Sequence, residues 1–145
     1  MVMAAEKLRE IVFQLLYVQD FDKNVAEDII PLLMREHAVT KKTLYIAQEK
    51  AAATLAKVPE IDALIASTSI EYSFDRIPRI ERNILRLGLF ELLFCADIPP
   101  KVALSEGVRL ARKFATPEAA QFVNAIMDVI WKKSCESKKE EALKS

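Results

Sequence analysis

The sequence contains only two glycines, Gly88 and Gly107, in 145 residues. Both stand inside apolar segments with helical periodicity, and neither stands in a candidate turn. Sheet proteins with many tight turns need residues that tolerate positive φ, and nucleotide-binding loops need glycines that let the backbone approach phosphates. The glycine content therefore argues against dinucleotide-binding folds, P-loops and all-β barrels, and it predicts an α-rich chain.

The length and the hydrophobic content, 52% of residues, suit one domain that buries roughly 68–70% of its unfolded surface. The most apolar stretch, Ile84–Ala96, contains charged residues and is shorter than the about 20 residues that a membrane-spanning helix needs. The first residues lack the pattern of a secretory signal. Cys95 and Cys135 are far apart and have no CxxC partner, so we interpret them as reduced thiols. These features predict a cytoplasmic protein without a membrane segment.

The apolar spacing predicts about seven helices, of which four precede residue 70. The first covers about residues 5–21. Asn24 and Glu27 nearly form a capping box, which opens a second helix that Pro31 should kink or split. Thr40 caps a third helix that runs to about Lys57, and Pro59 opens a short fourth helix.

Prolines also mark the starts of the last three helices. The fifth begins at Pro78 and is apolar almost all round, which predicts a central position. The sixth covers about residues 100–114. The seventh begins at the sequence Thr116-Pro117-Glu118 and runs to about Ser134. We expect one all-α domain over residues 1–135, followed by a charged, flexible tail at 136–145.

Basic residues are concentrated between residues 76 and 115, which hold 8 basic and 4 acidic side chains although the net charge of the chain is zero. Four polar residues of the sixth helix share one face by their spacing: Lys101, Ser105, Arg109 and Arg112. A basic face can neutralise phosphates, although an ordinary solvated face has the same pattern.

Arg86 lies midway along the most apolar helix, so we expect it to form a buried ion pair. Glu106 and Asp128, on other helices, are its candidate partners. Near the N-terminus, Arg9 and Tyr17 share one side of the first helix, where an aromatic ring beside a cation can stack on a base. The alternative is a boundary tyrosine whose hydroxyl is solvated.

The sequence shows no catalytic constellation. His37 is the only histidine, and no nucleophile is placed near it by sequence. One histidine and two separated cysteines do not supply the ligands of a zinc site. We therefore expect no enzymatic activity, no metal and no cofactor.

Three motifs in order and in register resemble the NusB family. They occupy residues 74–92, 98–106 and 121–128, and include Phe74-Asp75-Arg76-Ile77-Pro78 and Gln121-Phe122-Val123-Asn124-Ala125. The first helix fits more weakly, at Gln14-Leu15-Leu16-Tyr17, and residues 22–70 match in helical character only.

The resemblance implies an all-α fold of two small helical bundles packed together. It also implies a bacterial transcription antitermination and elongation factor. Members of this family bind a single-stranded boxA element of nascent RNA, such as a ribosomal RNA leader, together with NusE, a ribosomal small-subunit protein. The partners implied are therefore boxA-type RNA, NusE and the transcription elongation complex.

The resemblance also carries site residues over by position. Those assigned to RNA binding are Lys7, Arg9, Tyr17, Lys101, Glu118, Phe122 and Asn124, and those assigned to NusE binding are Glu81 and Arg82. Simpler interpretations exist for three of them: Phe122 as a core residue, Asn124 as a backbone-capping residue, and Glu81 as a first-turn acid favoured by the helix dipole.

One departure from the family concerns RNA affinity. The arginine-rich run that usually precedes the first helix is replaced by Ala5-Glu6-Lys7-Leu8-Arg9-Glu10. We therefore expect weaker and less salt-sensitive RNA binding by the isolated protein. Two alternatives stay open: a protein-interaction module that has lost RNA binding, and a detached NusB-like domain of a ribosomal RNA cytosine methyltransferase. A homodimer is also possible.

Overall fold

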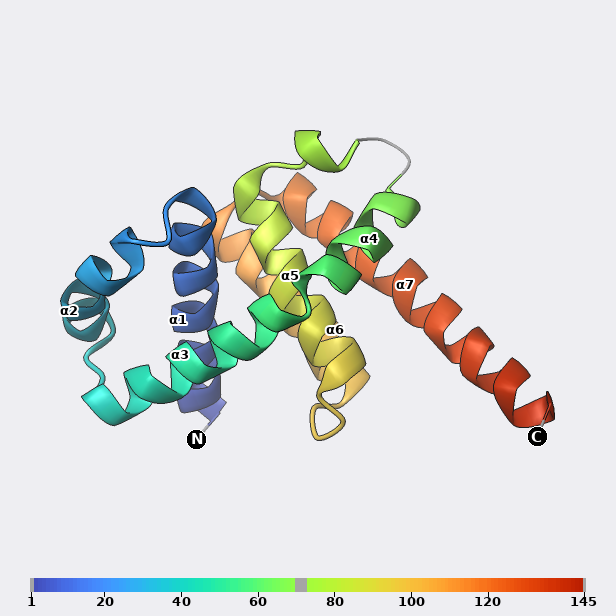
Figure 1. The fold of residues 1–145 in the computed structure, drawn as a ribbon, viewed down its shortest axis with the longest axis horizontal. Coiled ribbons are helices and arrows are strands. Elements are labelled where there is room, and N and C mark those ends of the chain that lie inside the picture. The colour runs from blue at the N-terminus through green and yellow to red at the C-terminus, as the bar shows by residue number, and fades with distance from the viewer. Residues whose placement is uncertain (1, 70–72, 145) are drawn as a thin grey trace. The chain divides into compact units, whose positions relative to one another are not determined.

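The computed structural model describes residues 2–69 and 73–144, and within them every regular element is a helix (Figure 1). This confirms the predicted all-α class. The elements are α1 (Val2–Phe21), α2 (Val25–His37), α3 (Lys41–Ala56), α4 (Val58–Thr68), the short 3-10 helix η1 (Phe74–Arg76), α5 (Arg79–Phe94), α6 (Pro100–Phe114) and α7 (Pro117–Lys144). The chain divides into two compact units, one up to Val58 and one from Pro59 onward.

In the first unit, α1 packs mainly against α3 and to a lesser extent against α2. Ala47 and Ala51 of α3 are fully buried, and their small side chains let α3 approach α1 closely. Thr40 caps α3 as predicted, because its hydroxyl accepts a hydrogen bond from the backbone N–H of Thr43 at 3.3 Å.

One prediction about α2 is wrong: Asn24 makes no side-chain cap, because its backbone is in the αR region whereas an N-cap takes the β region. Of the kink or split predicted at Pro31, the split does not occur, because the helix continues through this residue, which removes only one backbone donor. The helix ends at Ala38, which adopts a left-handed conformation (φ 53°) and donates its N–H to the carbonyl of Met34.

In the second unit, α5 packs against α6 and α7, which also pack against each other. Gly88 of α5 and Gly107 of α6 allow these helices to pack closely against α7. A Cβ atom at Gly88 would lie 2.8 Å from Cε of Met127, and one at Gly107 would lie 2.8 Å from Sδ of the same residue. The buried side chain of Met127 on α7 therefore takes the space that side chains on α5 and α6 would need.

Arg86 forms the expected buried ion pair, but with a partner that the sequence analysis did not consider. Its guanidinium donates two hydrogen bonds to Asp62 of α4, from Nε to Oδ1 at 2.9 Å and from Nη2 to Oδ2 at 2.7 Å. The two candidate acids pair within their own helices, Glu106 with Arg109 at 2.6 Å and Asp128 with Lys132 at 3.0 Å. Asp62 is the partner because α4 places its carboxylate within reach of the guanidinium of Arg86, which can donate two parallel hydrogen bonds to it.

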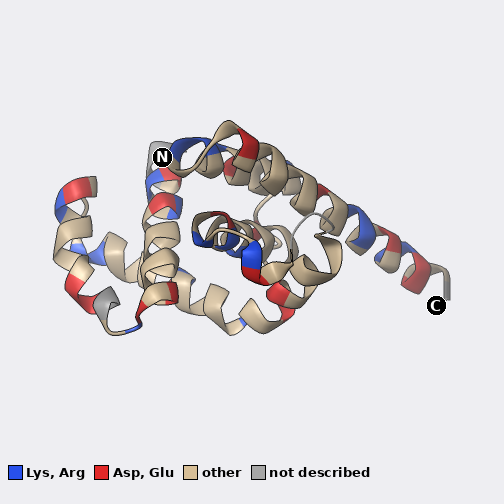
Figure 2. Ribbon diagram, turned by 90° about the horizontal axis from the view of Figure 1, so that it is seen from above, with Lys and Arg blue, Asp and Glu red and all other residues tan. Residues whose placement is uncertain are grey.

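The last helix is longer than predicted. It continues beyond Ser134 to Lys144, because residues 135–144 contain neither glycine nor proline and are rich in good helix formers. In Figure 1 the last turns of α7 extend beyond the other helices of its unit, and Figure 2 shows acidic and basic residues along them.

Candidate RNA and protein interface

A hollow of about 440 Å³ lies where the first turn of α5 meets the first turns of α7. It is lined by Glu81 from α5 and, from the start of α7, by Thr116, Glu118, Ala119, Gln121, Phe122 and Ala125. Thr116 fixes this end of α7, since its hydroxyl accepts the backbone N–H of Ala119 at 3.0 Å. We call this hollow the acidic pocket.

The acidic pocket brings together residues that the sequence analysis had assigned to two different ligands. Glu81 was assigned to NusE, and Glu118 and Phe122 to RNA. Among the described residues that line the pocket there is no lysine or arginine. Two carboxylates in a pocket whose described lining has no lysine or arginine attract a cationic side chain or an amino group.

Glu81 is half-buried, and this burial raises the pKa of its carboxyl above the ordinary value of 4.5. The ionised form is therefore held at an energetic disadvantage in the unbound protein. A positive group placed beside Glu81 by a partner would relieve that disadvantage. Its neighbour Arg82 does not line the pocket; its guanidinium lies over the ring of Phe74, 5.5 Å from the ring centre.

A second hollow, of about 410 Å³, lies between α6 and α7. Its lining combines an aliphatic floor with polar groups: Leu104, Ser105, Val108, Arg109, Arg112 and Asn124. We call it the basic groove. Three of the residues that were predicted to form a basic face of α6, Ser105, Arg109 and Arg112, thus line a concave surface. The fourth, Lys101, is exposed one turn before Ser105. Arg109 is held by Glu106, whereas Arg112 is exposed at the end of α6.

The two hollows separate residues that the sequence analysis grouped. Phe122 and Asn124 are two positions apart on α7, which turns their side chains to nearly opposite sides of the helix. Phe122 accordingly lines the acidic pocket and Asn124 the basic groove. The helical spacing of Phe122 and Asn124 already indicated that they face different sides. Leu104 and Val108, which line the basic groove, were not among the candidate residues, although their spacing of four residues places them on one side of α6.

On α1, the three candidate residues differ in accessibility. Lys7 is exposed, Tyr17 is half-buried, and Arg9 has only 9% of its surface exposed. The ring of Tyr17 packs between Phe13, at 6.1 Å, and Phe21, at 5.0 Å between ring centres. A tyrosine fixed by rings on both sides along the helix can present one edge to a base. Because Arg9 is buried, its side chain is better placed to pack within the first unit than to contact a phosphate.

Among the described residues, no three histidine, cysteine, aspartate or glutamate side chains gather as metal ligands would. None of the described helices combines the length and the apolar character needed to cross a bilayer. Neither Cys95 nor Cys135 forms a disulfide in this part of the chain.

Comparison with known sequences assigns the chain to a family over most of its length. Residues 6–132 match the model of the NusB family. The transcription antitermination protein NusB of Chlamydia pneumoniae is 35% identical over 126 residues, which are 87% of this chain and 79% of that protein. The corresponding protein of Dehalococcoides mccartyi is 32% identical over 132 residues, which are 91% of this chain and 92% of that protein.

Solved structures agree. A crystal structure of the antitermination factors NusB and NusE in complex with dsRNA contains a chain that matches with a TM-score of 0.77 and 28% identity, over 92% of this chain and 99% of that chain. A structure of T. maritima NusB matches with a TM-score of 0.74 and 31% identity, over 88% and 89% of the two chains. On sequence and fold together, this chain belongs to the NusB family.

Proposed function

We propose that this protein is a transcription antitermination factor that binds boxA-type single-stranded RNA together with NusE. The similarity to a chain in a complex of NusB, NusE and dsRNA carries the proposal. The acidic pocket and the basic groove support it, because they offer one surface suited to a cationic protein side chain and one suited to a nucleotide. In this proposal the protein acts by binding, without catalysis, in the cytoplasm on the transcription elongation complex.

The RNA contacts in this proposal combine stacking, charge and base recognition. Tyr17 and Phe122 supply rings for bases, Lys7 and Lys101 supply charge, and Asn124 supplies an amide beside Arg112 in the basic groove. The carboxylate of Glu118 can accept a hydrogen bond from the amino group of a base. Stacking needs unpaired bases, so we propose single-stranded RNA although the similar structure holds dsRNA.

The NusE contact centres on Glu81. A partially desolvated carboxylate in a pocket without lysine or arginine among its described lining residues favours a cationic side chain from a protein partner. Arg82 then contributes by holding Phe74 beside the start of α5.

Fluorescence anisotropy of a labelled boxA RNA, with and without purified NusE, tests the RNA contacts. We expect Tyr17→Ala to weaken binding by about tenfold, since stacking contributes about 1–3 kcal/mol per base. Tyr45→Ala, at an exposed tyrosine of α3, is the matched control and should have no effect. Scrambled RNA and duplex RNA of the same sequence complete the comparison, and we expect both to bind more weakly.

Calorimetric titration with NusE tests the protein contact. Glu81→Gln should weaken NusE binding, while Glu27→Gln, at an exposed first-turn acid of α2, should not. If boxA and scrambled RNA bind equally even with NusE present, while the effect of Glu81→Gln on NusE persists, the protein is instead an interaction module without RNA specificity. The acidic pocket is the observation that favours this second candidate.

A further inference from the structure

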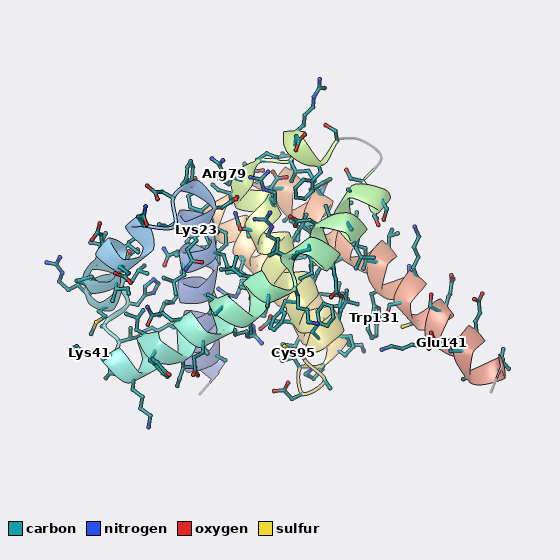
Figure 3. The ribbon with its side chains drawn as sticks, viewed as in Figure 1. Lys23, Lys41, Arg79, Cys95, Trp131 and Glu141 are labelled. Carbon is teal, nitrogen blue, oxygen red and sulfur yellow. The ribbon has the colours of Figure 1, made fainter. Side chains whose placement is uncertain are left out.

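A third hollow, of about 410 Å³, lies along the second half of α7, beside the ends of α4 and α5. It is lined by Leu64, Ser67, Thr68, Leu93, Ile130, Lys133, Ser134, Ser137, Lys138 and Glu141. Figure 3 labels Trp131 and Glu141, which lie on this part of α7. We call this hollow the α4–α7 groove.

The α4–α7 groove has an aliphatic floor and a basic rim. Leu64, Leu93 and Ile130 provide the floor, and Leu64 is 38% exposed, so apolar surface stays in contact with water. Lys133 and Lys138 stand on the rim, and the ammonium of Lys138 is held 6.0 Å from the ring centre of Trp131. Exposed apolar surface with a polar rim is typical of a protein-binding site.

The wall of this groove is formed by a part of the chain that the family match does not include. The match ends at residue 132, whereas the wall is built from Lys133 to Glu141 on the extension of α7. The helical rise places Lys138 about 30 Å from Glu118 along the axis of α7. A ligand in the groove would therefore leave the acidic pocket accessible.

We propose that the α4–α7 groove binds an acidic amphipathic helix of another protein. Apolar side chains of that helix would cover Leu64 and Leu93, which stay accessible beside the buried Ile130. Lys133 and Lys138 lie about 7.5 Å apart along the helix axis and about 140° apart around it, so each can pair with a different acid beside the apolar face of the partner. This is the mode in which an amphipathic helix lays its apolar face into a groove.

Two other occupants fit less well. RNA would find no aromatic ring among the described lining residues on which to stack a base. A second copy that presents the same face would bring two lysines and one glutamate from each chain into the interface, because a two-fold interface pairs identical surfaces, and would leave a net positive charge there. The charge pattern thus favours a different, acidic partner.

The test uses the full-length protein and two labelled helical peptides. Both carry leucines three and four residues apart on one face; the first has glutamates beside them and the second has lysines at the same positions. By fluorescence anisotropy we expect the acidic peptide to bind about tenfold more tightly, since each tenfold step needs only about 1.4 kcal/mol. The combined substitution Lys133→Glu and Lys138→Glu should reverse this preference.

Matched controls lie on the same helix. Lys139→Glu makes the same charge change at an exposed lysine outside the lining, and Leu143→Ser changes an exposed leucine outside it. Both should leave peptide binding unchanged, whereas Leu64→Ser should weaken it several-fold. Circular dichroism of each variant checks that the helices are intact.

Three results would overturn the proposal. The first is equal affinity, or no binding, of the two peptides to the wild-type protein. The second is displacement of the acidic peptide by an RNA oligonucleotide in a manner that depends on Lys133 and Lys138, which would assign the groove to RNA. The third is self-association in sedimentation experiments that the same two substitutions abolish, which would assign it to a second copy. None of these results depends on boxA or NusE binding.

Discussion

The two compact units differ in the contacts that join their helices. In the second unit, every residue of α5 from Asn83 to Leu92 is buried. Asp62 and Arg86 join α4 to α5 through a bidentate pair, and Asn83 adds a hydrogen bond from Nη1 of Arg86 at 3.2 Å. These contacts fix the start of α5, where Glu81 lines the acidic pocket.

In the first unit, α1 packs mainly against α3, and α2 contacts α3 only slightly. A side-chain hydrogen bond joins α2 to α1, between Nε2 of His37 and Oε1 of Gln14 at 2.6 Å. Large apolar side chains stay exposed on its helices, including Leu32, Tyr45 and Ile46. The candidate protein contact at Glu81 is thus built beside the ion-paired helices of the second unit, and the stacking residue Tyr17 on the helix that packs against α3 in the first.

The largest expected effect comes from breaking the ion pair of the second unit. Asp62→Ala should lower the free energy of unfolding by about 3–5 kcal/mol, because it leaves the guanidinium of Arg86 buried without that carboxylate. Urea denaturation followed by circular dichroism measures the change. Asp128→Ala removes an exposed pair with Lys132 and should cost less than about 0.5 kcal/mol.

Replacing both members of the buried pair separates charge from packing. Asp62→Leu combined with Arg86→Met should be closer to the wild type than either single alanine variant, since no uncompensated charge is left. A double variant that is as unstable as Asp62→Ala would show that the geometry of the pair, rather than its charge balance, stabilises this unit.

A second test addresses the close packing around Met127. Gly88→Ala should destabilise the protein by about 1–2 kcal/mol, because the new methyl overlaps a buried side chain that has little room to move. In a Met127→Ala background the same substitution should become stabilising by about 1 kcal/mol, since alanine is the better helix former. Thermal unfolding of the four proteins in this cycle gives both numbers. The same sign in both backgrounds contradicts the assignment of Met127 as the obstacle.

Local signals in the sequence predicted local structure well. Thr40 as a cap and α6 at Pro100–Phe114 are found where they were expected, because a hydroxyl cap and a first-turn proline act within one turn of backbone. The burial of Arg86 was also predictable, since apolar residues surround it on all sides of its own helix. Its partner was not, because the position of Asp62 depends on how α4 packs against α5.

The candidate site shows the same limit. That Glu118 and Phe122 lie together follows from a spacing of four residues on one helix. That Glu81 joins them in one pocket depends on the packing of α5 against α7, which no spacing within one segment contains. The groove at the far end of α7 escaped prediction because the sequence analysis ended this helix at Ser134.

A smaller effect is expected in the first unit, at the end of α2. Ala38 holds a left-handed conformation that costs an alanine about 1 kcal/mol and a glycine almost nothing. Ala38→Gly should therefore stabilise the protein by about 0.5–1 kcal/mol. Ala53→Gly, at an exposed position inside α3, makes the same exchange and should destabilise by about 1 kcal/mol. Thermal unfolding measures both changes in stability. Ala38→Gly should also slow amide hydrogen exchange near Met34, whose carbonyl accepts the N–H of residue 38.

The smallest effect on stability, and the one most closely tied to function, concerns Glu81. Burial raises the pKa of its carboxyl, so between pH 4.5 and the raised pKa the folded state binds more protons than the unfolded state. The stability contribution of Glu81 therefore falls as pH rises through this window. Glu81→Gln removes the titration, so the stability of the variant relative to the wild type should increase with pH across the same range.

Denaturation curves of Glu81→Gln and of the control Glu27→Gln, each measured below and above this window, test the expectation, and a difference that is independent of pH contradicts it. A carboxylate whose ionised form is disfavoured in the free protein gains when a partner places a positive charge beside it, so NusE should bind more weakly to Glu81→Gln even where that variant is the more stable protein. A substitution that raises stability and lowers affinity together would identify Glu81 as a residue kept for recognition rather than for folding.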